Sequence, residues 1–143
     1  MKITIIIPAL NEEKAIGQVI QRLPDYVDEI IIVDNGSTDQ TSQIARKAGA
    51  KTLYLAKAGY GRACLAGVAG AGACDILVFL DADGADFPEQ MDRLLQPIIE
   101  GEADMVIGSR TLGQVEAGAL TLPQRVGNRL ACALIGLFWG YAY

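Results

Sequence analysis

The chain has 143 residues, of which 51% are hydrophobic and 20% are charged, and its net charge is −5. This length and apolar content predict one compact α/β domain with a substantial core and exclude a disordered chain. The acidic balance argues against a nucleic-acid-binding protein, because the chain has no basic footprint for a phosphate backbone. Histidine is absent, which excludes Ser-His-Asp and Cys-His catalysis.

In chain order, short strands alternate with helices. Apolar runs rich in β-branched residues predict strands over residues 3–7, 29–33, 51–55, 76–80 and 104–107. Apolar residues at helical spacing predict helices over residues 14–23, 38–48, 63–71, 88–101 and 123–139. Asn11 is the predicted N-cap of the first helix, and Ser37 with Gln40 forms a predicted capping box for the second. This alternation implies right-handed βαβ units and a three-layer α/β fold with an open, mostly parallel sheet.

The sequence predicts a single domain over residues 1–143. Residues 1–110 carry the alternation, and residues 111–143 form a loop and a helix that is apolar all round from Ala131 onward. Nine such residues are too few to span a bilayer. Two alternatives stay open for this helix: packing against the domain, or contact with a membrane surface or with a second copy of the chain. The N-terminus lacks the length and cleavage site of a signal peptide, which predicts a cytoplasmic protein, at most at the inner face of the membrane.

Unusual polar stretches follow each predicted strand. They comprise residues 11–13, 34–37, 57–62, 81–86 and 109–110. In an open α/β sheet the ligand sits beyond the carboxyl ends of the strands, where the strand order reverses. The sequence therefore predicts one ligand site at this rim of the sheet.

The stretch from Asp81 to Asp86 holds three carboxylates without a Lys or Arg among them. Their mutual repulsion needs a compensating cation, a helix N-terminus or bulk water. Mg²⁺ and Mn²⁺ prefer carboxylate and water oxygens and are often held by one or two carboxylates plus substrate phosphates. Asp81 and Asp83 are therefore candidate metal ligands. The alternative is a solvated acidic turn, with Asp86 and Glu89 capping the following helix.

Three motifs in order, Pro8 to Glu13, Asp34 to Asp39 and Asp81 to Asp83, resemble the family 2 glycosyltransferases of the GT-A fold. Within that family the sequence looks most like the dolichyl- or polyprenyl-phosphate sugar synthase branch. The resemblance implies a nucleotide-diphospho-sugar transferase (GT-A, Rossmann-like) fold. Residues 1–110 would then be the nucleotide-sugar-binding core, and residues 111–143 an acceptor-side loop and apolar helix.

The resemblance also implies roles for individual residues. It implies a UDP- or GDP-linked sugar bound by Pro8, Ala9, Asn11, Glu12, Asp34, Gly36, Ser37, Lys57, Asp81 and Ala82. It implies Mg²⁺ or Mn²⁺ held by Asp83 and Asp81, and an acceptor phosphate gripped by Arg110 and Arg125, whose guanidinium forks can each bond two oxygens. Simpler roles stay open for two of these residues: helix-dipole stabilisation for Glu12 and an Asx-turn for Asp34. Ala85 departs from the branch, which often has Gln there as a further metal ligand.

The predicted function is sugar transfer to an acceptor, polyprenyl or dolichyl phosphate, by a metal-assisted inverting displacement, with Asp81, Asp83, Arg110 and Arg125 as the catalytic group. The resemblance stops at residues 140–143, where the family continues, so a C-terminally truncated chain is expected. Two alternatives remain: a non-catalytic nucleotide-sugar-binding or membrane-docking module, and a sugar-phosphate nucleotidyltransferase. Peripheral membrane contact and a homo-oligomer are left open, and no nucleic-acid partner is expected.

Overall fold

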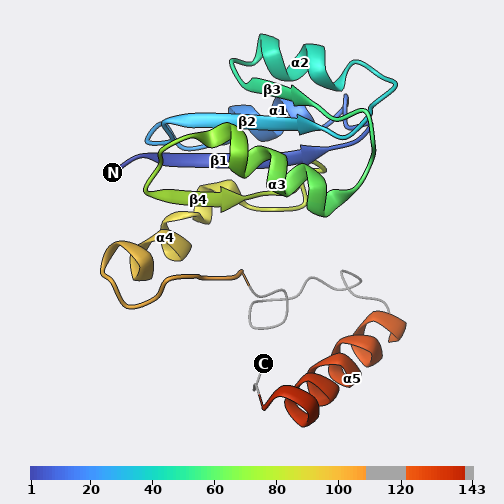
Figure 1. The fold of residues 1–143 in the computed structure, drawn as a ribbon, viewed down its shortest axis with the longest axis vertical. Coiled ribbons are helices and arrows are strands. Elements are labelled where there is room, and N and C mark those ends of the chain that lie inside the picture. Colours follow the sequence, from blue (N-terminus) through green and yellow to red (C-terminus); the bar gives the residue numbers. More distant parts are fainter. Residues whose placement is uncertain (109–121, 141–143) are drawn as a thin grey trace. The chain divides into compact units, whose positions relative to one another are not determined.

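The computed structural model of the protein describes residues 1–108 and 122–140. The chain divides into two compact units, Met1–Ala103 and Asp104–Tyr143. The first unit contains a four-stranded sheet with helices, and the second contains one long helix (Figure 1).

The sheet consists of four parallel strands, β1 (Ile3–Ala9), β2 (Glu29–Asp34), β3 (Lys51–Tyr54) and β4 (Ile76–Phe79). Their order across the sheet is β3-β2-β1-β4, and the four arrows point the same way in Figure 1. Every residue of β1 is buried, because this central strand is covered on both faces. The parallel open sheet predicted from the sequence is therefore confirmed.

Helices cover both faces of the sheet. Helices α1 (Ile16–Gln21), α2 (Thr41–Lys47) and α4 (Asp92–Ile99) contribute to one core cluster, together with the odd-numbered isoleucines of β1. Helix α3 (Tyr60–Ala71) packs against Ile6 and β2 in a second cluster. A short 3-10 helix, η1 (Pro88–Gln90), precedes α4. The result is the predicted three-layer arrangement (Figure 1).

Helix α3 approaches the sheet closely because its inner face carries small residues. Ala63, Gly67 and Ala71 are the buried positions of this helix and recur every four residues. A Cβ atom added at Gly67 would lie 2.3 Å from Cγ2 of Ile6. The small-residue pattern therefore sets how closely this helix can pack.

The predicted starts of four helices are wrong. Helix α3 begins at Tyr60 rather than Ala63, and α4 begins at Asp92, after the 3-10 helix, rather than at residue 88. Helix α1 begins at Ile16 rather than Lys14, and α2 begins at Thr41 rather than Thr38, both without a side-chain cap. Asn11 adopts a left-handed backbone with φ of 58°, and both Asn11 and Ser37 make hydrogen bonds between loops instead of capping helices. Their partners lie 26 or 27 residues away, so a local capping pattern cannot detect them.

The predicted fifth strand over residues 104–107 is also wrong. These residues have no strand assignment, and the side chains of Met105 and Ile107 are 74% and 67% exposed. An apolar run forms a strand only where a neighbouring strand supplies hydrogen-bonding partners. Within the described residues the sheet has four strands, and none of them pairs with this segment.

Helix α5 (Leu122–Trp139) confirms the helix predicted over residues 123–139. In the part of the chain that the structure describes, no helix is both long and apolar enough to cross a membrane. The two alternatives for the apolar end of α5, packing or surface contact, stay predictions.

Two fully buried threonines allow a matched test of core polarity. The hydroxyl of Thr4 on β1 has no hydrogen-bond partner among the described residues. The hydroxyl of Thr41 accepts a bond from the Glu12 amide and donates one to Asp39. We expect Thr4→Val to raise the free energy of unfolding by about 1 kcal/mol, because it removes an unpaired buried hydroxyl.

Thr41→Val should have the opposite sign and lower the free energy of unfolding by about 1–3 kcal/mol, because it leaves two partners unpaired. Urea denaturation at neutral pH measures both changes. Equal losses from the two substitutions would mean that the Thr4 hydroxyl is hydrogen-bonded after all.

Candidate functional site

The reversal of strand order lies between β1 and β4. The chain runs outward from β1 to β2 and β3, then returns to place β4 on the other side of β1. Pairing between β1 and β4 ends at Ile6 and Phe79, whereas pairing between β1 and β2 continues to Ala9 and Asp34. The segment after β4 therefore separates from β1 and leaves space at the carboxyl ends of the strands, where open α/β sheets bind ligands.

Pro8 fits this point of separation. The carbonyls of Lys2 and Ile6 accept bonds from the β4 side, so the backbone of Pro8, two residues further along, faces the same side. Proline has no amide hydrogen and would break a ladder between paired strands. Here β4 has already ended, so the missing donor leaves no partner unsatisfied.

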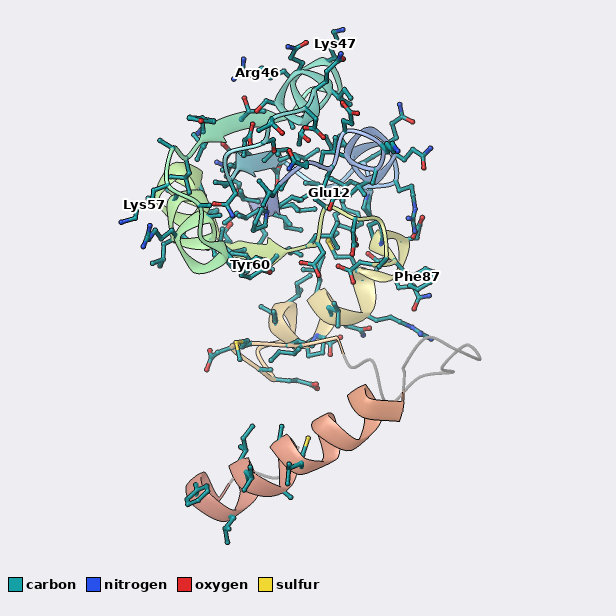
Figure 2. The ribbon with its side chains drawn as sticks, turned by 90° about the vertical axis from the view of Figure 1, so that its right-hand side faces the viewer. Glu12, Arg46, Lys47, Lys57, Tyr60 and Phe87 are labelled. Atoms are coloured by element: carbon teal, nitrogen blue, oxygen red, sulfur yellow. The ribbon has the colours of Figure 1, made fainter. Side chains whose placement is uncertain are left out.

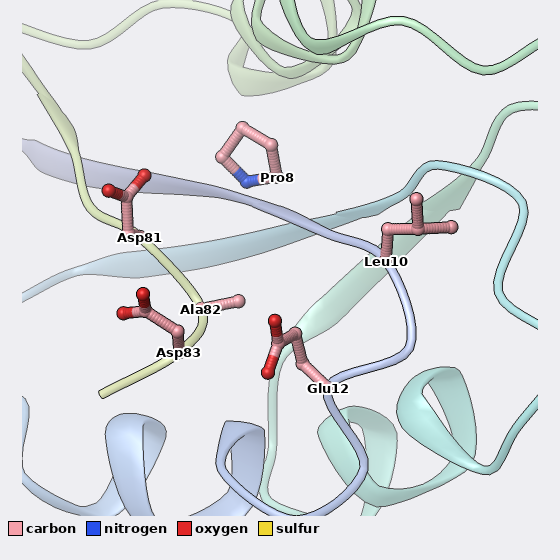
Figure 3. Close-up of a pocket in the computed structure, with 6 residues that line it drawn as sticks. All are labelled: Pro8, Leu10, Glu12, Asp81, Ala82 and Asp83. Carbon is pink, nitrogen blue, oxygen red and sulfur yellow. The ribbon is translucent and has the colours of Figure 1, made fainter. Parts of the chain in front are cut away.

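A pocket of about 220 Å³ fills the space between the two segments. Its lining residues are Pro8, Leu10, Glu12, Asp81, Ala82 and Asp83. Figure 3 shows Asp81, Ala82 and Asp83 on the segment after β4, with Ala82 pointing toward Glu12 of the segment after β1. The pocket thus combines three carboxylates with an apolar wall from Pro8, Leu10 and Ala82.

The acidic segment after β4 forms a compact turn. The Asp86 side chain accepts a hydrogen bond from the Asp81 amide at 3.1 Å, and Asp83 accepts one from the Ala85 amide at 2.9 Å. Gly84 has a φ of +78°, which favours glycine, and Ala82 is only 5% exposed. Asp86 therefore organises this turn, and the predicted cap from Asp86 and Glu89 is wrong because no side chain caps the following helix.

The carboxylates of this pocket suit a divalent ion that is also bound by a ligand. Among the described residues, no group of three or more His, Cys, Asp or Glu side chains forms a closed metal site. Asp81 and Asp83 nevertheless line one pocket, and the acidic segment contains no cationic residue. One or two carboxylates completed by phosphate and water oxygens is the usual donor set for Mg²⁺. The residues present therefore fit such an ion.

Reciprocal hydrogen bonds join the loop after β1 to the loop after β2. The Asn11 side chain accepts a bond from the Thr38 amide at 2.8 Å, and the Asn11 amide donates to Ser37 Oγ at 3.0 Å. Further along, Glu12 donates its amide hydrogen to Thr41 Oγ1, and Glu13 donates its own to Asp39. These bonds fix the loop that carries Glu12 into the pocket.

Asp34, at the end of β2, is 4% exposed and is held by hydrogen bonds. The Ser37 amide donates to Asp34 Oδ1 at 2.7 Å, and the Ser42 hydroxyl donates to Oδ2. Burial by itself raises the pKa of Asp34, but the bonds from Ser42, Ser37 and Gly36 together outweigh it and lower the pKa below its ordinary value. Asp34 therefore stabilises the loop after β2 through its side chain, and its carboxylate stays ionised. Its predicted contact with the nucleotide stays a prediction.

The structure brings together part of the predicted site. Five of the predicted residues line the pocket: Pro8, Glu12, Asp81, Ala82 and Asp83. Asn11, Asp34, Gly36 and Ser37 lie in or beside the joined loops, and Ala9 is buried in the core. Lys57 is exposed and extends outward, away from Glu12 (Figure 2). Arg110 and the side chain of Arg125 lie outside the described residues.

Three residues near the site were missed by the sequence analysis. Leu10 lines the pocket, and Asn35 accepts a hydrogen bond from the Gly59 amide at 2.8 Å. Tyr60, at the start of α3, donates its hydroxyl hydrogen to Asp81 Oδ1 at 3.4 Å. Burial and then the Asp81 charge raise the pKa of Tyr60. Both contacts join residues at least 20 positions apart, so no local pattern predicts them. Only Asn35 could have been suspected, because it directly follows Asp34.

This sheet order and strand-end acidic pocket define a glycosyltransferase fold of the GT-A type. A sequence model of the family described as Glycosyl transferase family 2 matches residues 4–140. The chain belongs to this family. Among solved structures, it is similar to glucosyl-3-phosphoglycerate synthase of Mycobacterium tuberculosis, with 35% identity and a TM-score of 0.61 over 71% of this chain and 41% of that one.

Two curated archaeal relatives carry names that state a reaction. One is the UDP-N-acetylglucosamine–dolichyl-phosphate N-acetylglucosaminyltransferase of Methanococcus voltae, which is 34% identical over 97% of this chain and 64% of the relative. The other is the dolichyl-phosphate hexose transferase of Haloferax volcanii, which is 37% identical over 94% of this chain and 60% of the relative. The chain thus spans less than two thirds of each.

The depressed pKa of Asp34 predicts an acid-sensitive fold. A carboxyl group whose pKa is lower in the folded chain contributes stability above its unfolded pKa and loses it as the pH falls through the folded value. The ordinary pKa of an aspartate such as Asp34 is 3.8. We expect the free energy of unfolding to fall as the pH drops from about 5 through 3.8 and below. Asp34→Asn should be less stable than wild type at pH 6 but should lose less stability on acidification.

Urea denaturation at several pH values measures this slope. Asp25→Asn, which changes an exposed carboxylate between α1 and β2, is the control and should retain the wild-type slope. Equal acid slopes for wild type and Asp34→Asn would contradict the assignment.

Proposed function

We propose that the chain binds a nucleoside-diphosphate sugar at the pocket between β1 and β4 and transfers the sugar to a polyprenyl or dolichyl phosphate. The observation that carries this proposal is the meeting of Asp81 and Asp83 with Pro8 and Glu12 in one pocket. Family membership supports the reaction type, and the names of the M. voltae and H. volcanii relatives support the acceptor.

The donor half of the proposed site follows from the positions of the lining residues. Asp81 and Asp83 would hold Mg²⁺ or Mn²⁺, which when bound supplies Lewis-acid stabilisation of the departing diphosphate. The M. tuberculosis synthase has been solved with Mn²⁺ and UDP-glucose, which supports the choice of ion and of a uridine nucleotide. Pro8 and Leu10 offer an apolar wall beside these carboxylates. The joined loops after β1 and β2 would hold the nucleoside in a fixed orientation.

The proposed acceptor removes the need for a general base. A phosphate monoester is already ionised at neutral pH, whereas a sugar hydroxyl must lose a proton as it attacks. The chain contains no histidine. An acceptor phosphate oxygen would form the new bond to the anomeric carbon while the bond from that carbon to the diphosphate breaks, with inversion at that carbon.

The acceptor half of the site rests on residues outside those that the structure describes. Arg110 and Arg125 are proposed to bind the acceptor phosphate through bidentate hydrogen bonds. Because a polyprenyl phosphate lies in the bilayer, the chain would contact the membrane surface during transfer. A small phosphorylated acceptor is the second candidate, since the M. tuberculosis synthase has been solved with phosphoglyceric acid.

Calorimetric titration with UDP and with GDP, each with and without Mn²⁺, tests the donor site. We expect Mn²⁺ to strengthen binding of one nucleotide, and Asp83→Asn to weaken the metal-dependent binding at least about tenfold. The asparagine oxygen can still accept the Ala85 amide bond, so the turn is kept. Asp25→Asn, an exposed carboxylate on the loop after α1, is the matched control and should bind as wild type does.

Transfer itself is measured with radiolabelled UDP-sugars and GDP-sugars and two acceptors, polyprenyl phosphate in detergent and 3-phosphoglycerate. Label in the lipid fraction supports the proposed acceptor, and label on phosphoglycerate supports the second candidate. Metal-dependent nucleotide binding without transfer to either would favour a non-catalytic module. Absence of nucleotide binding by the folded chain would overturn the donor site.

A further inference from the structure

Arg22 connects α1 to the acidic segment that follows β4. It is the residue directly after the last turn of α1, and its guanidinium forms a two-pronged ion pair with Glu89 of η1. Nε lies 2.6 Å from Glu89 Oε1, and Nη2 lies 3.0 Å from Oε2. The same guanidinium donates to the carbonyl oxygens of Asp86, at 3.3 Å, and Gly84, at 3.5 Å.

These contacts fall on the backbone of the turn that presents Asp81 and Asp83. Gly84 follows Asp83 directly, and the Asp86 side chain accepts the hydrogen bond of the Asp81 amide. Arg22 therefore fixes the backbone of residues 84–86. Asp86 in turn fixes Asp81, because its side chain accepts the Asp81 amide bond. Glu89 in turn fixes the direction of the guanidinium, because both of its oxygens are engaged.

A contribution to folding stability does not by itself explain the contacts of Arg22 with Glu89 and with the turn. The side chains of Arg22 and Glu89 are 35% and 52% exposed, and exposed ion pairs contribute little to folding. Placement is a stronger reason, since functional carboxylates must be held within roughly 0.5 Å of their working geometry by residues around them. Arginine suits this task because its planar fork reaches a carboxylate and backbone carbonyls at once.

We propose that Arg22 is a positioning residue for the divalent-ion and diphosphate site, and that it acts through the backbone of residues 84–86 without touching the ligand. This inference rests on the proposed function, because it assumes that Asp81 and Asp83 bind a metal nucleotide. Arg22 and Glu89 are 67 residues apart, and neither was a predicted site residue.

The test is a Mn²⁺ titration followed by the electron paramagnetic resonance signal of free Mn²⁺, with UDP or GDP present and with the full chain. We expect Arg22→Met to weaken Mn²⁺ binding in the ternary complex roughly tenfold. Arg22→Lys should be intermediate, because one ammonium cannot keep all four contacts. Arg93→Met, which changes an exposed arginine on α4, is the matched control and should bind as wild type does.

Metal-free nucleotide affinity and the thermal midpoint are measured for the same variants. Positioning predicts that both stay close to the wild-type values while the Mn²⁺ affinity falls. Unchanged Mn²⁺ affinity in Arg22→Met, or a parallel loss of metal-free affinity and thermal stability, would overturn the role of Arg22 and leave the donor site standing. Failure of wild type to bind Mn²⁺ with either nucleotide would overturn the donor site and this inference together.

Discussion

The separation of β4 from β1 is the constraint on which the rest of the site depends. Strand β1 continues three residues beyond its last pairing with β4, while β2 still supports it on the other side. Two chain segments therefore leave the sheet next to each other without continuing the ladder between β1 and β4. A proline is tolerated in a central strand here, and a pocket opens at the reversal of strand order. In this way the topology of the sheet, more than any single residue, sets where a ligand can bind.

The acidic residues around this rim divide into two groups with different physical roles. Asp34, Asp39 and Asp86 accept hydrogen bonds from nearby amides or hydroxyls and shape the loops. Asp81, Asp83 and Glu12 line the pocket itself. Hydrogen bonds from nearby groups stabilise the charged form of the first group, which is why the pKa of Asp34 is lowered despite burial. The second group lines the pocket, where a cation and a diphosphate can bind, although Asp83 also accepts the Ala85 amide bond and Asp81 the Tyr60 hydroxyl bond. Family 2 membership is consistent with this division, because a glycosyltransferase needs a pocket that binds the diphosphate of its donor.

Local patterns in the sequence predicted most of the framework. The apolar β-branched runs gave four of the strands, and the polar residues after them gave the rim at which Pro8, Glu12, Asp81 and Asp83 meet. The errors share one physical origin, which is that the partner of a group lies far along the chain. Asn11 and Ser37 make hydrogen bonds between two loops instead of capping helices, and residues 104–107 are not among the paired strands of the described residues. Tyr60 near Asp81 and Arg22 beside Glu89 were invisible for the same reason, since neither pair carries a local signature.

The segments after β1 and β4 are proposed to form one metal-nucleotide site together. Paramagnetic broadening of backbone amide signals by Mn²⁺, recorded by NMR with UDP or GDP present, tests it most directly because the effect falls steeply with distance from the ion. We expect the signals from residues 81–85 and from Leu10 and Glu12 to broaden first, and Mg²⁺ in excess to restore them. Broadening centred on other carboxylates, such as Glu100 and Glu102 after α4, or broadening that does not depend on the nucleotide, would contradict it.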